Sequence, residues 1–124
     1  MARMEHLALV ALGGLVGALV RYGVVEFWGT SGFPWHTLLV NVVGSGLLGL
    51  VSACTAPVRL QRLVAVGFCG GLTTFSTLSL EVVRFLDDGD GAVAVIYVAA
   101  SVILGLAAFV AARMLAPPNP GLQP

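Results

Sequence analysis

The chain has 124 residues, of which 58% are hydrophobic and only 10% are charged. A soluble domain carries about 25% charged residues, and a surface of this composition would expose apolar patches that aggregate. Six arginines balance six acidic residues and there is no lysine, so the chain has no basic patch for nucleic acid. The composition excludes an ordinary soluble enzyme, a disordered chain and a nucleic-acid-binding protein. The 16 glycines indicate close helix packing or a broken helix in a membrane.

Four apolar windows follow one another along the chain, each long enough to cross about 30 Å of hydrocarbon as an α-helix. Backbone in hydrocarbon must satisfy its own hydrogen bonds, and the alternating strands of a barrel are absent from the sequence. We therefore predict an all-α, integral membrane, four-helix bundle as a single domain over residues 1–116, followed by a Pro-rich tail over 117–124. The predicted spans are 7–25, 37–56, 63–85 and 91–113.

The arginines favour an orientation with both termini in the cytoplasm, but by a small margin. The side that carries the termini has four arginines and the other side has two: Arg3, Arg59, Arg62 and Arg113 against Arg21 and Arg84. So small a bias fits a fixed orientation, and equally a protein that inserts in both orientations.

Glycines spaced four apart in the first and third predicted spans predict close helix packing. Gly13 and Gly17 form one such pair, and Gly67 and Gly71 form another. Small residues at this spacing let helix backbones approach each other, within one subunit or between two.

The third predicted span combines glycines with hydroxyls. Gly70-Gly71 predicts a break in the helix near the middle of the membrane, where Thr73 and Thr74 can satisfy freed backbone groups. The free carbonyls of a broken helix can hold a cation, and the start of the resumed helix can face an anion. The alternative is an intact packing helix whose hydroxyls bond back to carbonyls one turn earlier.

Polar residues in the other predicted spans leave alternatives open. Asn41 either bonds another helix or lines a polar path, because an amide in hydrocarbon needs partners. Tyr97 and Ser101 share one helix face, so they either extend a polar track or, for Tyr97, anchor the span at the interface. His36, at a window edge, is predicted to be interfacial.

The donors in the spans favour a small anion or a neutral solute. Hydroxyls and an amide can replace hydration water, and the ring edge of Phe75 is positively polarised. The alternative is a small four-helix, proton-coupled exporter of the multidrug type, which needs a carboxylate within a span. Glu81, late in its span, is the candidate for that role. Since no pair of nucleophile and base is visible, an enzyme is not expected.

The sequence resembles the Fluc/CrcB family of fluoride channels over essentially its whole length. The resemblance rests on three motifs in order: 13–18 followed by Arg21-Tyr22, 37–45, and 67–77, which reads GFCGGLTTFST. It implies a fluoride-selective passive channel in the cell inner membrane, which exports toxic fluoride from the cytoplasm. It also implies a dimer of two oppositely oriented subunits in membrane lipid.

The same resemblance implies particular site residues. Main-chain carbonyls of Gly70 and Thr73, from both subunits, would hold a structural Na⁺ at the dimer interface. Arg21 would lie near an aqueous vestibule. The implied fluoride pathway comprises Asn41, Phe75, Ser76, Thr77, Glu81, Tyr97 and Ser101.

One position departs from the pattern of the family, which often has a second phenylalanine where this chain has Leu78. Leucine offers no polarised ring edge to an anion. Either a homodimer conducts without that ring, or this chain is one subunit, conducting or not, of a heterodimer with a paralogous partner.

Overall fold

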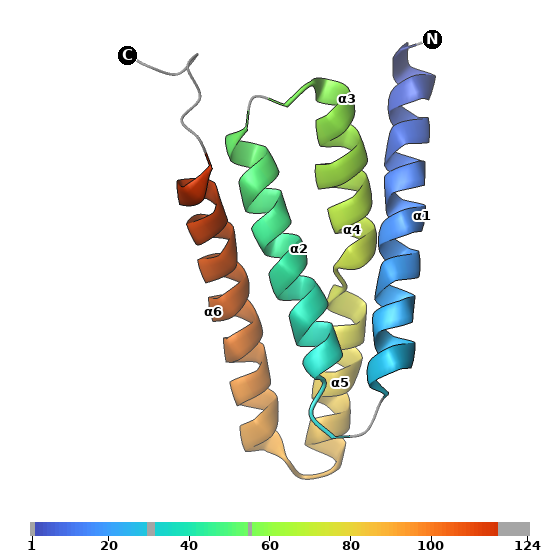
Figure 1. Cartoon of the computed structure of the whole chain (residues 1–124). Helices are drawn as coiled ribbons and strands as arrows, with labels where there is room; N and C mark the ends of the chain where they lie inside the picture. Colours follow the sequence, from blue (N-terminus) through green and yellow to red (C-terminus); the bar gives the residue numbers. More distant parts are fainter. Residues whose placement is uncertain (1, 30–31, 55, 117–124) are drawn as a thin grey trace.

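A computed structural model describes residues 2–29, 32–54 and 56–116. Within these ranges the chain is almost entirely helical and contains no strand (Figure 1). The elements in chain order are α1 (Ala2–Trp28), α2 (Trp35–Ala53), α3 (Val58–Leu60), the π-helix η1 (Gln61–Phe68), α4 (Cys69–Leu72), α5 (Phe75–Asp87) and α6 (Gly91–Leu115). The predicted all-α class is confirmed, whereas the predicted tail over 117–124 lies outside the described residues.

Four helical segments are long and apolar enough to cross a membrane, as predicted. They are Arg3–Trp28, Trp35–Ala53, Val58–Asp87 and Gly91–Leu115. Pro34 and Pro57 directly precede α2 and α3, where the fixed φ of proline suits a first helical turn and its missing N–H is not needed. The third segment is a stack of α3, η1, α4 and α5.

The segments run alternately up and down, so that the start of α1 and the end of α6 lie at the same end of the bundle (Figure 1). α2 packs along α6, α1 packs along η1 and α4, and α5 packs against α6. The third segment therefore contacts each of the other segments, and its irregular middle is held from several sides.

Glycines bring α1 and the third segment into backbone contact. A methyl group on Gly17 would collide with the carbonyl oxygen of Phe68. A methyl group on Gly71 would likewise collide with the carbonyl oxygen of Gly14. The packing role predicted for the spaced glycines is confirmed, and here it operates within one subunit.

The helix break lies at Thr73 and Thr74, which corrects the predicted position at Gly70-Gly71. Both glycines are helical in α4, whereas Thr73 (φ −80°, ψ 153°) and Thr74 (φ −148°, ψ 121°) are extended. Glycine weakens a helix wherever it stands, but side-chain hydrogen bonds decide where this helix opens.

Candidate functional site

Asn41, in the middle of α2, holds the extended backbone at the break. Its Nδ2 donates to the Thr74 carbonyl oxygen at 3.1 Å, and its Oδ1 accepts from the Thr74 N–H at 2.8 Å. The amide thus replaces the acceptor that the Thr74 N–H would have in a continuous helix, and it adds a donor to the Thr74 carbonyl, which as N-cap of α5 also accepts the first bond of that helix. Of the two alternatives left open by the sequence, Asn41 does bond another segment, and it also lines a groove beside the break.

The two threonines at the break satisfy further backbone groups with their hydroxyls. Thr73 Oγ1 donates to the Cys69 carbonyl oxygen at 2.8 Å, which closes the end of α4. Thr74 Oγ1 accepts from the Thr77 N–H at 3.2 Å and so caps the start of α5. The predicted use of these threonines on freed backbone groups is confirmed.

Three hydroxyls form a cluster at the start of α5. Thr74 Oγ1 lies 3.2 Å from Ser76 Oγ and donates to Thr77 Oγ1 at 3.0 Å. The backbone N–H groups of the first turn of α5 point out of the N-terminal end of the helix, and this end carries positive partial charge. This end of α5 therefore presents donors and partial charge of the kind that an anion requires.

Carbonyls at the end of α4 lose their helical donors at the break, and those of Gly70 and Thr73 are two of them. The N–H of Thr74, which a continuous helix would direct to the Gly70 carbonyl, donates to Asn41 instead. The N–H of Thr77, the helical donor for the Thr73 carbonyl, donates to the Thr74 hydroxyl. These freed carbonyls belong to the two residues from which the resemblance implies sodium ligands, and carbonyls of unwound helix suit such a cation.

A groove of about 350 Å³ runs along the break on the face shared by α2 and the third segment. Phe75, the first residue of α5, is 81% exposed at its rim. An added methyl group on Gly70 would meet nothing within 4 Å. The lining is Asn41, Gly44, Ser45, Leu48, Ala65, Cys69, Gly70, Thr73, Thr74, Phe75 and Leu78.

Further along α5, Glu81 is buried with only 8% of its surface exposed. Thr37 Oγ1 donates to Glu81 Oε1 at 2.8 Å, and the Tyr97 hydroxyl donates to Oε2 at 2.6 Å. Tyr97 is fully buried, so it is not the interfacial anchor of the open alternative. Glu81 is thus the centre of a polar cluster from α2, α5 and α6.

His36, at the start of α2, belongs to the same cluster, and its interfacial position in the membrane stays a prediction. It is 7% exposed, and its Nε2 lies 3.3 Å from Glu81 Oε1. Sequence reasoning also missed Thr37 as a partner of Glu81. Neither contact follows from spacing, because each joins residues more than forty positions apart on different helices.

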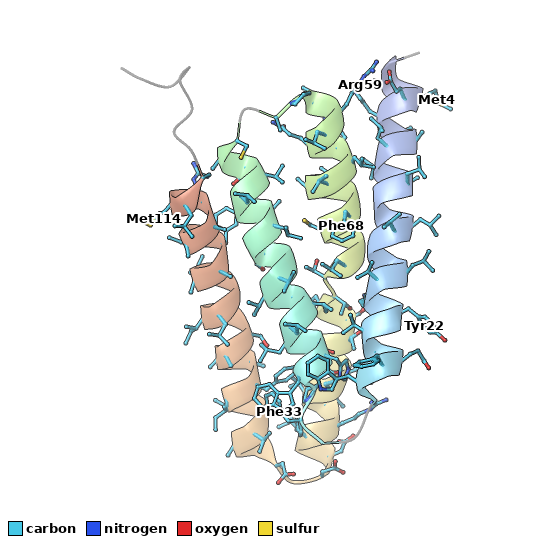
Figure 2. All side chains as sticks on the ribbon, in the orientation of Figure 1. Met4, Tyr22, Phe33, Arg59, Phe68 and Met114 are labelled. Carbon is cyan, nitrogen blue, oxygen red and sulfur yellow. The ribbon has the colours of Figure 1, made fainter. Side chains whose placement is uncertain are left out.

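Aromatic rings close over the cluster at the end of the bundle away from the termini. The Phe33 ring centre lies 5.3 Å from that of Tyr97 and 4.6 Å from that of Trp35. Figure 2 shows Phe33 at this end and Arg59 at the opposite end. Beside the rings, a cavity of about 370 Å³ opens onto His36 and Glu81.

The remaining predicted site residues are less concentrated. Ser101 Oγ donates to the Tyr97 carbonyl oxygen one turn earlier at 2.8 Å, a bond back to its own helix. Arg21 lies half-buried on α1, a helix that lines neither the groove nor the cavity. The structure therefore brings the predicted residues into two groups, one at the break and one around Glu81.

The sequence similarity to known proteins extends over both groups of site residues. A family model described as CrcB-like protein, Camphor Resistance (CrcB), matches residues 8–113. The fluoride-specific ion channel FluC of a Thermus thermophilus strain is 45% identical over 112 residues, covering 83% of this chain and 88% of the relative. Proteins of the same name from Citrifermentans bemidjiense and Rhizobium johnstonii are 43% and 42% identical. They cover 81% and 87% of this chain, and 87% and 93% of their own lengths.

Proposed function

This chain belongs to the CrcB-like family, and from that premise we propose that it conducts fluoride passively across a cell membrane. It is a multi-pass membrane protein whose relatives are named as fluoride-specific ion channels. Its role is that of a channel and not of an enzyme. Downhill flow through the plasma membrane would relieve the cytoplasm of toxic fluoride.

The observation that carries this proposal is the break at Thr73 and Thr74. Fluoride is small and strongly hydrated, so a pore must replace its water with donors that still let it leave. The start of α5 offers the Ser76 and Thr77 hydroxyls, beside an exposed phenylalanine ring and the Asn41 amide. One amide hydrogen of Asn41 is bound by Thr74, and an amide carries two.

The proposed route continues from the break toward Glu81. Asn41, Phe75, Ser76 and Thr77 would receive the ion beside the break. Residues on α5 and α6 would carry it further, and Arg21 would attract it near a vestibule. The members of that second section are Glu81, Tyr97 and Ser101.

The proposed active form is a dimer of oppositely oriented subunits. A single subunit leaves the break open in a groove and Phe75 81% exposed, and a second copy would cover both. A Na⁺ ion between the two copies would be held by the Gly70 and Thr73 carbonyls. Their loss of helical donors supports this proposal, because such oxygens suit a hard cation.

Leu78 is the residue on which the choice between a homodimer and a heterodimer with a paralogous subunit depends. It lines the groove together with Phe75, so it occupies a place where a second ring could contact the ion. If the single ring of each subunit is sufficient, the chain conducts as a homodimer. If it is not, a paralogous subunit would supply the missing ring.

A proton-coupled exporter is the less favoured alternative. Such a protein needs a carboxylate that is free to exchange substrate and protons. Both carboxylate oxygens of Glu81 already have partners, Thr37 and His36 at Oε1 and Tyr97 at Oε2.

The proposal is tested by reconstituting the chain alone into liposomes loaded with potassium fluoride. Fluoride release is followed with a selective electrode, with chloride-loaded vesicles as the control. We expect fluoride release without chloride release and without an imposed proton gradient. Release that requires a proton gradient would support the exporter. No release from the chain alone, but release after addition of a paralogous subunit, would support the heterodimer.

A further inference from the structure

The buried contact between His36 and Glu81 has no role in the route described so far. The imidazole Nε2 lies 3.3 Å from the Glu81 carboxylate, and the two side chains are 8% and 9% exposed. A buried carboxylate is costly unless an opposite charge or hydrogen bonds compensate it. The Thr37 and Tyr97 hydroxyls supply hydrogen bonds but no charge. The net charge of the cluster therefore depends on the protonation of His36.

Other charged groups near His36 do not take over this role. Arg84, Asp88 and Asp90 line the same cavity from α5 and the turn before α6, and none of them forms an ion pair with Glu81 in the described part of the chain. Glu26, near the end of α1, is exposed and outside the cavity lining. Histidine is the side chain whose unperturbed charge changes between about pH 5 and 8.

We propose that His36 is a positioning residue that makes fluoride conduction pH-dependent through its contact with Glu81. The proposal rests on the proposed function, in which the anion passes beside Glu81. With His36 protonated, the imidazolium and the carboxylate cancel, and an approaching anion meets a neutral cluster. With His36 neutral, the carboxylate charge is uncompensated and repels the anion. Loss of the imidazole proton as the pH rises therefore lowers the flux.

The test is fluoride efflux from proteoliposomes at symmetric pH values from about 5.5 to 8.5, the range in which histidine titrates. Wild type is compared with His36→Gln. His6→Gln is the matched control, because His6 lies near the start of α1 beside Arg3 and Arg62, in a separate cavity. Protein-free vesicles at each pH give the leak of hydrogen fluoride through lipid, which is subtracted.

We expect the flux of wild type and of His6→Gln to fall about tenfold or more across this range. The repulsion between one uncompensated buried charge and the passing anion exceeds the free energy that corresponds to a tenfold change in rate. The His36→Gln profile should be flat. A flat wild-type profile would overturn the proposal without any variant, and so would a His36→Gln profile with the wild-type slope. Absence of wild-type fluoride release at every pH would overturn the proposed function itself, which separates the two failures.

Discussion

Replacement of Asn41 with leucine tests the Asn41 clamp, the pair of hydrogen bonds between the Asn41 amide and the Thr74 backbone at the helix break. Leucine has a similar size but removes both hydrogen bonds to Thr74, the donor to its carbonyl oxygen and the acceptor of its N–H. Thr74 is only 7% exposed, so water does not fully replace the lost partners. The Thr74 carbonyl keeps the first helical donor of α5, so the N–H is the group left without a partner, and the loss of its bond lowers the free energy of unfolding by about 1–3 kcal/mol.

Asn41→Asp isolates one half of the clamp. The carboxylate still accepts from the Thr74 N–H, but it faces the Thr74 carbonyl oxygen across the present 3.1 Å contact with no proton between them. It also places a negative charge in the proposed anion path, so we expect it to suppress fluoride flux at least as strongly as leucine does.

Unfolding in detergent and fluoride efflux from proteoliposomes are measured for both variants. Gln61→Leu is the matched control, because Gln61 also donates an amide hydrogen bond to a backbone carbonyl, that of Ala56, but in an exposed position. We expect the control to keep its stability and flux. Wild-type stability together with wild-type flux in Asn41→Leu would refute the reasoning.

Three further predictions follow from the packing and charges. Gly17→Ala should lower stability by about 1–3 kcal/mol through overpacking, since the added methyl group would meet the Phe68 carbonyl. Gly23→Ala, whose methyl group meets nothing within 4 Å, should be at least as stable as wild type in the same unfolding assay, by up to about 1 kcal/mol. Arg59→Ala, which removes an exposed 2.8 Å ion pair with Glu5, should change stability by less than about 1 kcal/mol; a larger loss would show that the pair contributes more than surface pairs do. Exchange of Na⁺ for an organic cation during purification should lower both the unfolding temperature and the fluoride flux, and unchanged values would contradict the proposed sodium site.

The four spans and the existence of a break could be predicted from the sequence, because these depend on local composition. Long apolar windows are sufficient for membrane helices, and glycines followed by threonines indicate a helix that opens. The position of the break could not be predicted in this way. It depends on Asn41, which bonds Thr74 across 33 positions of the chain, and so on the packing of α2 against the third segment.

The glycines illustrate the same limit. From the sequence, Gly70-Gly71 is the candidate for the break, and Gly71 is also a candidate for packing through its pairing with Gly67. In the structure Gly71 lies against the backbone of Gly14, whereas Gly70 has open space beside it. The rotation of the helix about its axis, which depends on the packing of the whole bundle, places Gly71 against α1 and Gly70 beside the groove.

The Glu81 cluster could be predicted in part. Glu81 and Tyr97 were expected on one route through the resemblance, and a direct hydrogen bond of 2.6 Å now joins them. His36 and Thr37 were not expected there, because a residue at the edge of an apolar window is equally compatible with the interface and with the interior. Burial at a helix end is decided by the neighbouring segments, here by α5, whose Glu81 contacts both residues.

The most direct test of the central claim, that this chain is a fluoride-selective channel, is the reversal potential in a planar bilayer with fluoride on one side and chloride on the other. A fluoride-selective channel gives a reversal potential far from zero, with the sign that fluoride flow sets, and we expect Asn41→Asp to suppress the current. A reversal potential near zero, or one that follows chloride, would contradict the central claim.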